Sequence, residues 1–151
     1  MNSRKELVKV QFYDRDIGYE NLWADELGKR RYRIESIPFF IYGVSRHDVV
    51  TASPDEEGRL QFGKVVERTG NRTLRARSED FITNATLKKK VVTALKKRGC
   101  DVEELRSRLL AIDVPPAVNL QAVTDYLTND AKVSWEYGNP ENLNKNTGAQ
   151  Q

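Results

Sequence analysis

The spacing of apolar side chains changes near residue 78, and this change constrains the fold more than any other feature of the sequence. From residue 7 to about residue 77, short segments alternate apolar and polar side chains, beginning with residues 7–13. Alternation with period two is typical of strands that bury one face, because successive side chains point to opposite sides of a strand. Beyond residue 78 much of the apolar spacing becomes that of helices. The sequence therefore predicts an α+β protein whose first part is rich in strands.

Turn signals divide this first part into short strands. The clearest signal is the run Pro54-Asp55-Glu56-Glu57-Gly58, because proline, glycine and acidic residues favour turns. The expected strands lie near residues 7–13, 21–27, 31–34, 48–52, 59–68 and 72–77, the last two joined as a hairpin around Gly70-Asn71. Residues 1–77 are therefore predicted to form a β-rich meander, folded as a small curved sheet or open barrel.

Two helices are predicted in the second part. Asn84 or Thr83 can cap a helix over residues 85–98, and Gly99 is placed to end it. Another helix is expected over residues 117–128, directly after two prolines.

The segment between these helices fits two descriptions. Residues 101–114 can form either one helix or two strands, and we favour two strands because apolar side chains alternate with Asp113. With a closing strand at residues 132–137, two strands give a strand-helix-strand-strand-helix-strand order that starts near Arg72, as in ferredoxin-like domains. The predicted organisation is a β-rich subdomain at 1–77, a ferredoxin-like α/β half at 78–138 and a disordered tail at 139–151.

The composition predicts a folded cytoplasmic protein. The chain is 38% hydrophobic and 31% charged, which suits a globular fold better than a disordered chain. No run approaches the roughly 20 apolar residues of a membrane-spanning helix, and Lys9 interrupts what would have to be the apolar core of a signal peptide. From the missing apolar run and the interrupted signal core we expect no membrane partner. Cys100 is the only cysteine, so no internal disulfide can form.

No arrangement of residues predicts catalysis. The only histidine, His47, lies in the run Ser45-Arg46-His47-Asp48, but adjacent residues on a turn cannot aim at one another as a catalytic triad does. One histidine and one cysteine cannot supply the usual zinc ligands. Gly63-Lys64 lacks the partner glycine of a phosphate-binding loop. We expect no catalytic residues, no metal ligands and no cofactor, and therefore a protein that is not an enzyme.

Two groups of residues are candidates for binding. The apolar segment 37–44 is expected to fill the core of the β-rich part; the alternative is an exposed aromatic anchor formed by Phe39, Phe40 or Tyr42. The basic residues of strand 72–77 and of helix 85–98 are either solvated or form a surface for phosphates or for an acidic protein. The candidate partner-binding residues are Tyr32, Tyr42, Arg75, Arg77 and Trp135.

Several short segments lie at a specific spacing along the first half of the chain. They are Leu22-Trp23-Ala24, Tyr32-Arg33-Ile34, residues 37–45, Asp48-Val49-Val50 and Gly70-Asn71-Arg72-Thr73-Leu74-Arg75. Their spacing resembles that of a bacterial family, domain of unknown function 4265. The chain departs from the family at His47, where a glycine is usual, and at Thr69-Gly70-Asn71, where a Ser-Gly-His run often stands.

The resemblance implies a bacterial origin and no agreed activity. Many small bacterial families of this kind are similar to immunity proteins, which bind and neutralise a toxin domain. Together with the missing catalytic set, this similarity predicts a non-enzymatic protein-binding protein, an immunity protein whose partner is a toxin domain. The alternative is a module that binds nucleic acid or a phosphate-bearing ligand.

Overall fold

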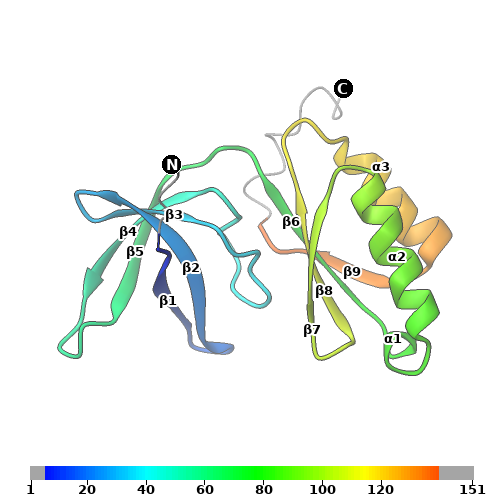
Figure 1. The fold of residues 1–151 in the computed structure, drawn as a ribbon, viewed down its shortest axis with the longest axis horizontal. Coiled ribbons are helices and arrows are strands. Elements are labelled where there is room, and N and C mark those ends of the chain that lie inside the picture. The colour runs from blue at the N-terminus through cyan, green and yellow to red at the C-terminus, as the bar shows by residue number, and fades with distance from the viewer. Residues whose placement is uncertain (1–5, 140–151) are drawn as a thin grey trace.

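Two β-sheets lie side by side in the computed structural model, which describes residues 6–139 (Figure 1). The first sheet is a closed barrel of β1 (Val8–Asp14), β2 (Gly18–Gly28), β3 (Arg31–Ile34), β4 (Val49–Pro54) and β5 (Leu60–Glu67). The second sheet, in the order β7-β8-β6-β9, contains β6 (Arg72–Arg77), β7 (Asp101–Leu105), β8 (Leu109–Val114) and β9 (Ser134–Tyr137). Helices cover one face of the second sheet (Figure 1). The chain is therefore an α+β protein, as predicted.

The alternation with period two fills the interior of the barrel. β1 and β2 pair antiparallel along their length, and their inward side chains Val10, Phe12 and Leu22 are buried. Phe12 stacks on Phe62 of β5 with 4.5 Å between ring centroids. The expectation of an open barrel was wrong, because β1 also pairs in parallel with β5, with Val10 opposite Leu60. This pairing removes the free edge that an open barrel would leave.

β6 does not form the expected hairpin with β5. It lies inside the second sheet, where it pairs antiparallel with β8 on one side and β9 on the other. All of β6 except Arg77 is buried, as in an interior strand with both faces covered. Turn signals at Gly70-Asn71 describe only neighbours in sequence, so they do not reveal partners that lie far along the chain. The chain passes from the first sheet to the second between β5 and β6, which is before the boundary predicted at residue 77.

Residues 101–114 form two strands, the alternative that the alternation favoured. β7 and β8 pair antiparallel from Asp101 opposite Asp113 to Leu105 opposite Leu109. Arg106 in the intervening turn has a positive φ of 53°, a left-handed conformation that matches the twist of paired strands in tight hairpins.

The helices pack on the face of the second sheet that carries Leu74 and Ala76. They are α1 (Asp80–Thr83), α2 (Ala85–Lys97), α3 (Leu120–Asp125) and the π-helical η1 (Tyr126–Ala131). Asn84 caps α2 as predicted, since its side-chain oxygen accepts the N–H of Leu87 at 3.0 Å. The helix expected over residues 117–128 begins later, with Asn119 as its cap, and continues into η1.

Within residues 6–139, no helix combines the length and the apolar character needed to cross a membrane. The tail expected at residues 139–151 lies, except for Asn139, outside the described residues.

Candidate binding cleft

Cross-strand rows of side chains cover the face of the second sheet that points away from the helices. Arg77, Arg75 and Thr73 of β6 belong to this face, because they alternate with Leu74 and Ala76 of the helix-covered face. The strand registers define three rows: Leu105, Leu109, Arg77 and Ser134; then Glu103, Ala111, Arg75 and Glu136; then Asp101, Asp113 and Thr73.

The loop of residues 35–48, which joins β3 to β4, covers the second and third rows. The Tyr42 hydroxyl donates to the carboxylate of Glu136 at 2.7 Å and 2.8 Å. Nearer the other end of the loop, Arg46 donates to Asp101 at 2.6 Å. In Figure 1 this cyan loop extends from the barrel toward the second sheet. The first row, at the end of the sheet near the β7–β8 turn, stays uncovered.

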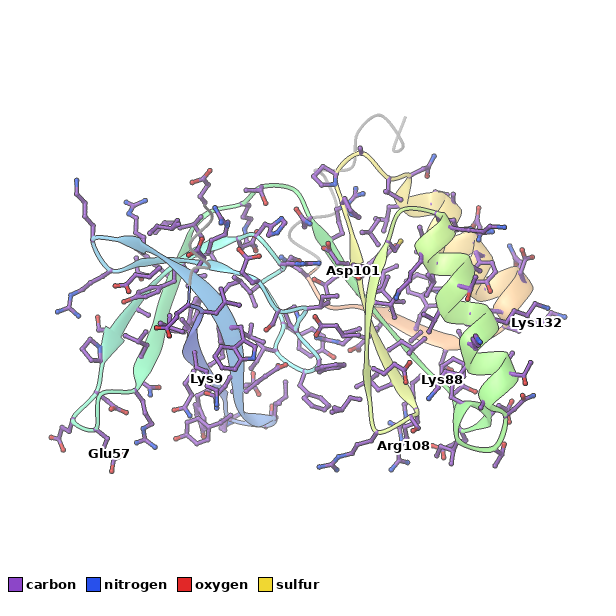
Figure 2. All side chains as sticks on the ribbon, viewed as in Figure 1. Lys9, Glu57, Lys88, Asp101, Arg108 and Lys132 are labelled. Carbon is purple, nitrogen blue, oxygen red and sulfur yellow. The ribbon has the colours of Figure 1, made fainter. Side chains whose placement is uncertain are left out.

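The uncovered row forms the floor of a cleft of about 730 Å³. Phe39 and Phe40 of the loop also line it, and Figure 2 shows Arg108 at the tip of the β7–β8 hairpin beside it. Apolar and positively charged side chains alternate around this cleft. Its charged lining consists of Arg75, Arg77, Arg106 and Arg108 with one carboxylate, Glu136.

Glu20 of β2 holds the N–H groups of the loop wall. Its two carboxylate oxygens accept the backbone N–H groups of Phe39 at 2.8 Å, Phe40 at 3.0 Å and Ile41 at 2.9 Å. Backbone N–H groups outside a strand ladder need such partners, and hydrogen bonds to a charged acceptor are stronger than neutral ones. The barrel therefore fixes the position of both phenylalanines.

Arg75 of β6 holds the carbonyl groups of the same segment. Its Nη1 donates to the carbonyl oxygens of Pro38 at 3.3 Å and Ile41 at 3.0 Å. Its Nε donates to Glu136 at 3.0 Å, and only 2% of the Arg75 side chain is exposed. Residues 38–41 are thus held through their N–H groups by an anion from the barrel and through their carbonyls by a cation from the second sheet. We call Glu20 and Arg75 the loop clamp.

Two neighbours fix the plane of the Arg75 guanidinium. The Tyr42 ring covers it with 4.5 Å between Cζ and the ring centroid, a cation–π contact. A Cβ added at Gly138 would lie 3.2 Å from Cζ, so the glycine lets the backbone approach closely. The hydrogen bond that Tyr42 donates to Glu136 also raises the pKa of the tyrosine.

Two arginines at the mouth of the cleft share one carboxylate. Arg108 Nη1 lies 3.4 Å and Arg77 Nη2 lies 3.7 Å from Oε2 of Glu79. The side chains of Arg77 and Glu79 are about two-thirds exposed, at 65% and 66%. Exposed pairs of this kind contribute at most about 1 kcal/mol each. Glu79 is therefore held weakly and can be exchanged for another anion.

The structure brings three of the five predicted binding residues, Arg75, Arg77 and Tyr42, to this region. Trp135 borders the cleft, but it lies opposite Ala76 in register, so its side chain packs on the helix-covered side and its indole N–H donates to Thr128 at 2.9 Å. Tyr32, in contrast, is 5% exposed in the barrel core, because it shares the inward phase of β3 with the buried Ile34. Tyr32 is a core residue and not part of a binding surface.

The apolar segment 37–44 is only partly buried. Ile37, Ile41 and Val44 are buried, whereas Phe40 and Tyr42 are 45% and 51% exposed. Core packing therefore accounts for part of the segment, and the role of its exposed aromatic side chains as a partner anchor stays a prediction.

The basic residues of β6 and α2 do not form one surface. Arg75 and Arg77 face the loop and the cleft, while α2 covers the opposite face of the sheet (Figure 1). Arg72, on the helix-covered side, is fully buried and donates to the carbonyl oxygens of Val114, Pro115 and Val118. Buried arginines on both faces of β6 show that its positive charge is partly structural.

Sequence reasoning missed the residues that build the cleft around these arginines. Glu20 could be identified from the sequence, because the alternation of β2 places its charged side chain on the same inward face as Leu22. Arg106 and Arg108 lie on the turn that joins the two strands favoured for residues 101–114, but their proximity to Phe40 depends on how the two sheets pack. No local pattern encodes that packing.

The run from Ser45 to Asp48 forms a turn, as expected. Asp48 accepts the backbone N–H of Ser45 at 2.9 Å, and His47 has a positive φ of 74°. The Ser45 hydroxyl lies 2.7 Å from the Thr73 hydroxyl, whereas the nearest carboxylate to His47 Nε2 is that of Glu35, at 3.5 Å. Across residues 6–139, no cluster of three or more histidine, cysteine, aspartate or glutamate side chains is arranged to hold a metal ion.

Cys100 is expected to resist thiol reagents in the folded protein. Burial raises the pKa of its thiol to about 12, from 9.0, and the side chain is nearly inaccessible. A shift of this size lowers the thiolate fraction at pH 8 by about a thousand-fold. Labelling with a disulfide reagent at pH 8, followed spectroscopically, should therefore require denaturant. Rapid labelling of one equivalent without denaturant would contradict this prediction.

The same shift predicts a pH effect on stability. Because the folded-state pKa is raised, the contribution of the neutral thiol is fully present below pH 9 and is lost as the pH rises through about 12. The Cys100→Ser variant should not be labelled even in denaturant. Its free energy of unfolding should also lack the loss that the thiol causes as the pH rises from 9 to about 12.

Comparison with known proteins supports the fold described above. A family profile described as Domain of unknown function (DUF4265) matches residues 20–137, which span most of the barrel and the whole second sheet. The chain is similar to a solved structure described as "Novel crystal structure of a hypothetical protein from Neisseria gonorrhoeae", with a TM-score of 0.65 and 16% identity over 91% of this chain and 96% of that chain. At this identity the likeness concerns the fold. No curated protein matches this chain.

Proposed function

We propose that this chain, which belongs to the family Domain of unknown function (DUF4265), is a non-enzymatic protein-binding protein. The observation that carries the proposal is the cleft between the loop of residues 35–48 and the β7–β8 hairpin. It joins exposed aromatic surface at Phe40 to several arginines. Aromatic residues and arginine are the residue types that most often dominate the binding energy of protein interfaces.

The rigidity of the cleft wall supports binding as its role. The loop clamp holds residues 38–41 through five hydrogen bonds to backbone atoms. A surface ordered before binding loses less conformational entropy when the partner arrives. Such a surface suits a protein that blocks its partner by occupying it.

We assign the partner to toxin domains and the chain to the role of an immunity protein in the bacterial cytoplasm. The support for this class of partner is the similarity of small bacterial families of this kind to immunity proteins. The positive lining of the cleft adds a physical preference, since electrostatic complementarity steers association toward an acidic surface.

A second candidate function is binding of nucleic acid or a phosphate-bearing ligand. The three exposed arginines of the cleft, Arg77, Arg106 and Arg108, favour it, because a guanidinium group can bind two phosphate oxygens at once. Binding of this kind weakens steeply with salt. Tight, salt-sensitive binding to mixed oligonucleotides at physiological salt would favour this second function over the first.

Stoichiometry tests the first proposal. A toxin domain encoded beside this chain is expected to lose all activity at about one equivalent of the protein, since tight binding removes free toxin. The double variant Phe40→Ala, Arg108→Gln should weaken binding about ten-fold or more, whereas His47→Ala, outside the cleft, should leave the titration unchanged. Protection far below one equivalent would indicate turnover and would contradict a binder.

We further propose that residues 72–139 form a ferredoxin-like unit that follows the barrel. The antiparallel order β7-β8-β6-β9, with α2 after β6 and α3 after β8, supports this assignment. The boundary between the two units then falls between β5 and β6.

A further inference from the structure

The charged lining of the cleft is mainly positive. The sequence carries 25 basic and 22 acidic residues, a surplus of +3. Four arginines and one glutamate line the cleft, so its lining alone has the same surplus. Glu136 is already bonded to Arg75 and Tyr42, which leaves Arg77, Arg106 and Arg108 to set the charge that a ligand meets.

Apolar surface lies next to these arginines. Leu109 is the cross-strand neighbour of Arg77 on the cleft floor, and Leu105 lies beside Leu109 in the same row. Phe40, 45% exposed, forms the facing wall. A ligand that fills this cleft must therefore present an anionic group and an apolar side chain a few ångströms apart.

Glu79 shows which anion fits between the two arginines at the mouth. One of its carboxylate oxygens lies within 4 Å of both Arg77 and Arg108. All three side chains are substantially exposed, at 65%, 45% and 66% for Arg77, Arg108 and Glu79, so water screens the pairs and the carboxylate is replaceable.

We infer that the cleft takes an extended acidic segment of the partner, whose carboxylate displaces Glu79 and whose apolar side chain packs between Phe40 and Leu109. This inference rests on the proposed protein-binding function and adds the chemistry of the bound segment. Glu79 then acts as an internal competitor, because it must release Arg77 and Arg108 before the segment binds. A carboxylate is favoured over a phosphodiester strand because the side chain of Glu79 already places a carboxylate between Arg77 and Arg108.

Capped synthetic peptides test the inference directly. The probe alternates Asp or Glu with Phe, and two matched peptides carry Asn or Gln for the acids and Ala for Phe. The fluorescence anisotropy of each labelled peptide, titrated with the protein, measures its affinity. We expect the acidic aromatic peptide to bind, and each matched peptide to bind about ten-fold more weakly or worse.

Two variants with opposite expected effects test the role of Glu79. Glu79→Gln should tighten peptide binding about two- to five-fold, because it removes the competing charge. The double variant Arg77→Gln, Arg108→Gln should weaken binding about ten-fold or more. Lys89→Gln with Lys90→Gln, exposed on α2 across the sheet, makes the same charge change and should have no effect.

Several outcomes would overturn the inference. The first is a neutral peptide that binds as tightly as the acidic one. The second is an unchanged or lower affinity of Glu79→Gln for the acidic peptide. The third is a single-stranded oligonucleotide that binds more tightly than the acidic peptide. If these occur while one equivalent still inhibits a toxin domain, only the chemistry of the bound segment is wrong. If no stoichiometric complex forms at all, the protein-binding function itself fails.

Discussion

Arg75→Met is expected to lower the free energy of unfolding by about 3 kcal/mol. The substitution keeps most of the apolar stem of the side chain but removes the guanidinium group that donates to Pro38, Ile41 and Glu136. Each lost hydrogen bond of a charged group is worth about 1.5–3 kcal/mol. The new sulfur atom recovers part of this loss through packing, because the site is almost fully buried. Urea denaturation followed by circular dichroism measures the difference.

Arg77→Met is the matched control for this prediction. Arg77 lies on the same strand and the same face as Arg75, but its side chain is 65% exposed. Substitution there should change stability by about 0.5 kcal/mol or less. Arg75→Lys keeps the charge without the bidentate geometry, and should fall between the wild type and Arg75→Met. If Arg75→Met and Arg77→Met unfold at the same urea concentration, Arg75 does not hold the loop.

Glu20→Ala is expected to lower the free energy of unfolding by about 2–3 kcal/mol. Three backbone N–H groups, those of Phe39, Phe40 and Ile41, lose their common acceptor, and unsatisfied donors that stay partly buried are costly. Glu20→Gln should lose less stability than Glu20→Ala, because the amide keeps one acceptor oxygen. It should still be less stable than the wild type, because its NH₂ group faces another donor. Both variants should also weaken binding in the cleft, because the wall at Phe39 and Phe40 is no longer fixed.

Glu26→Gln provides the comparison for Glu20. Glu26 lies on the same strand and is exposed, so its change should leave both stability and binding unchanged. Amide hydrogen exchange gives a residue-specific readout, since the N–H groups of residues 39–41 should exchange faster in the Glu20 variants. Wild-type protection of those three amides would contradict the clamp.

Local patterns in the sequence predicted the elements better than their partners. The alternation of residues 7–13 corresponds to β1, and the cap at Asn84 begins α2. The alternation around Asp113 correctly favoured two strands. These features depend on neighbours in the chain, which is why a single sequence reveals them.

The errors concern contacts between distant segments. β6 was joined to β5 because a turn signal precedes it, yet its partners β8 and β9 follow much later. The prediction of Tyr32 as a binding residue is wrong because Tyr32 shares its face of β3 with Ile34, and both are buried in the barrel core. The sequence predicts Arg75 as either solvated or part of a binding surface, and not its burial, because burial of a charge depends on acceptors, here Pro38 and Ile41, that lie far away in sequence.

The loop clamp also bears on how this protein can evolve. The wall of the cleft is part of a loop that belongs to the barrel, and the floor is part of the second sheet. A gene fragment that encodes only one of the two units would carry neither a complete cleft nor both halves of the clamp. Recombination between relatives can therefore preserve the loop clamp only when Glu20 and Arg75 are inherited together, although 55 positions of sequence, with most of the barrel strands, separate them. Both sheets must therefore be inherited together for this surface to be kept.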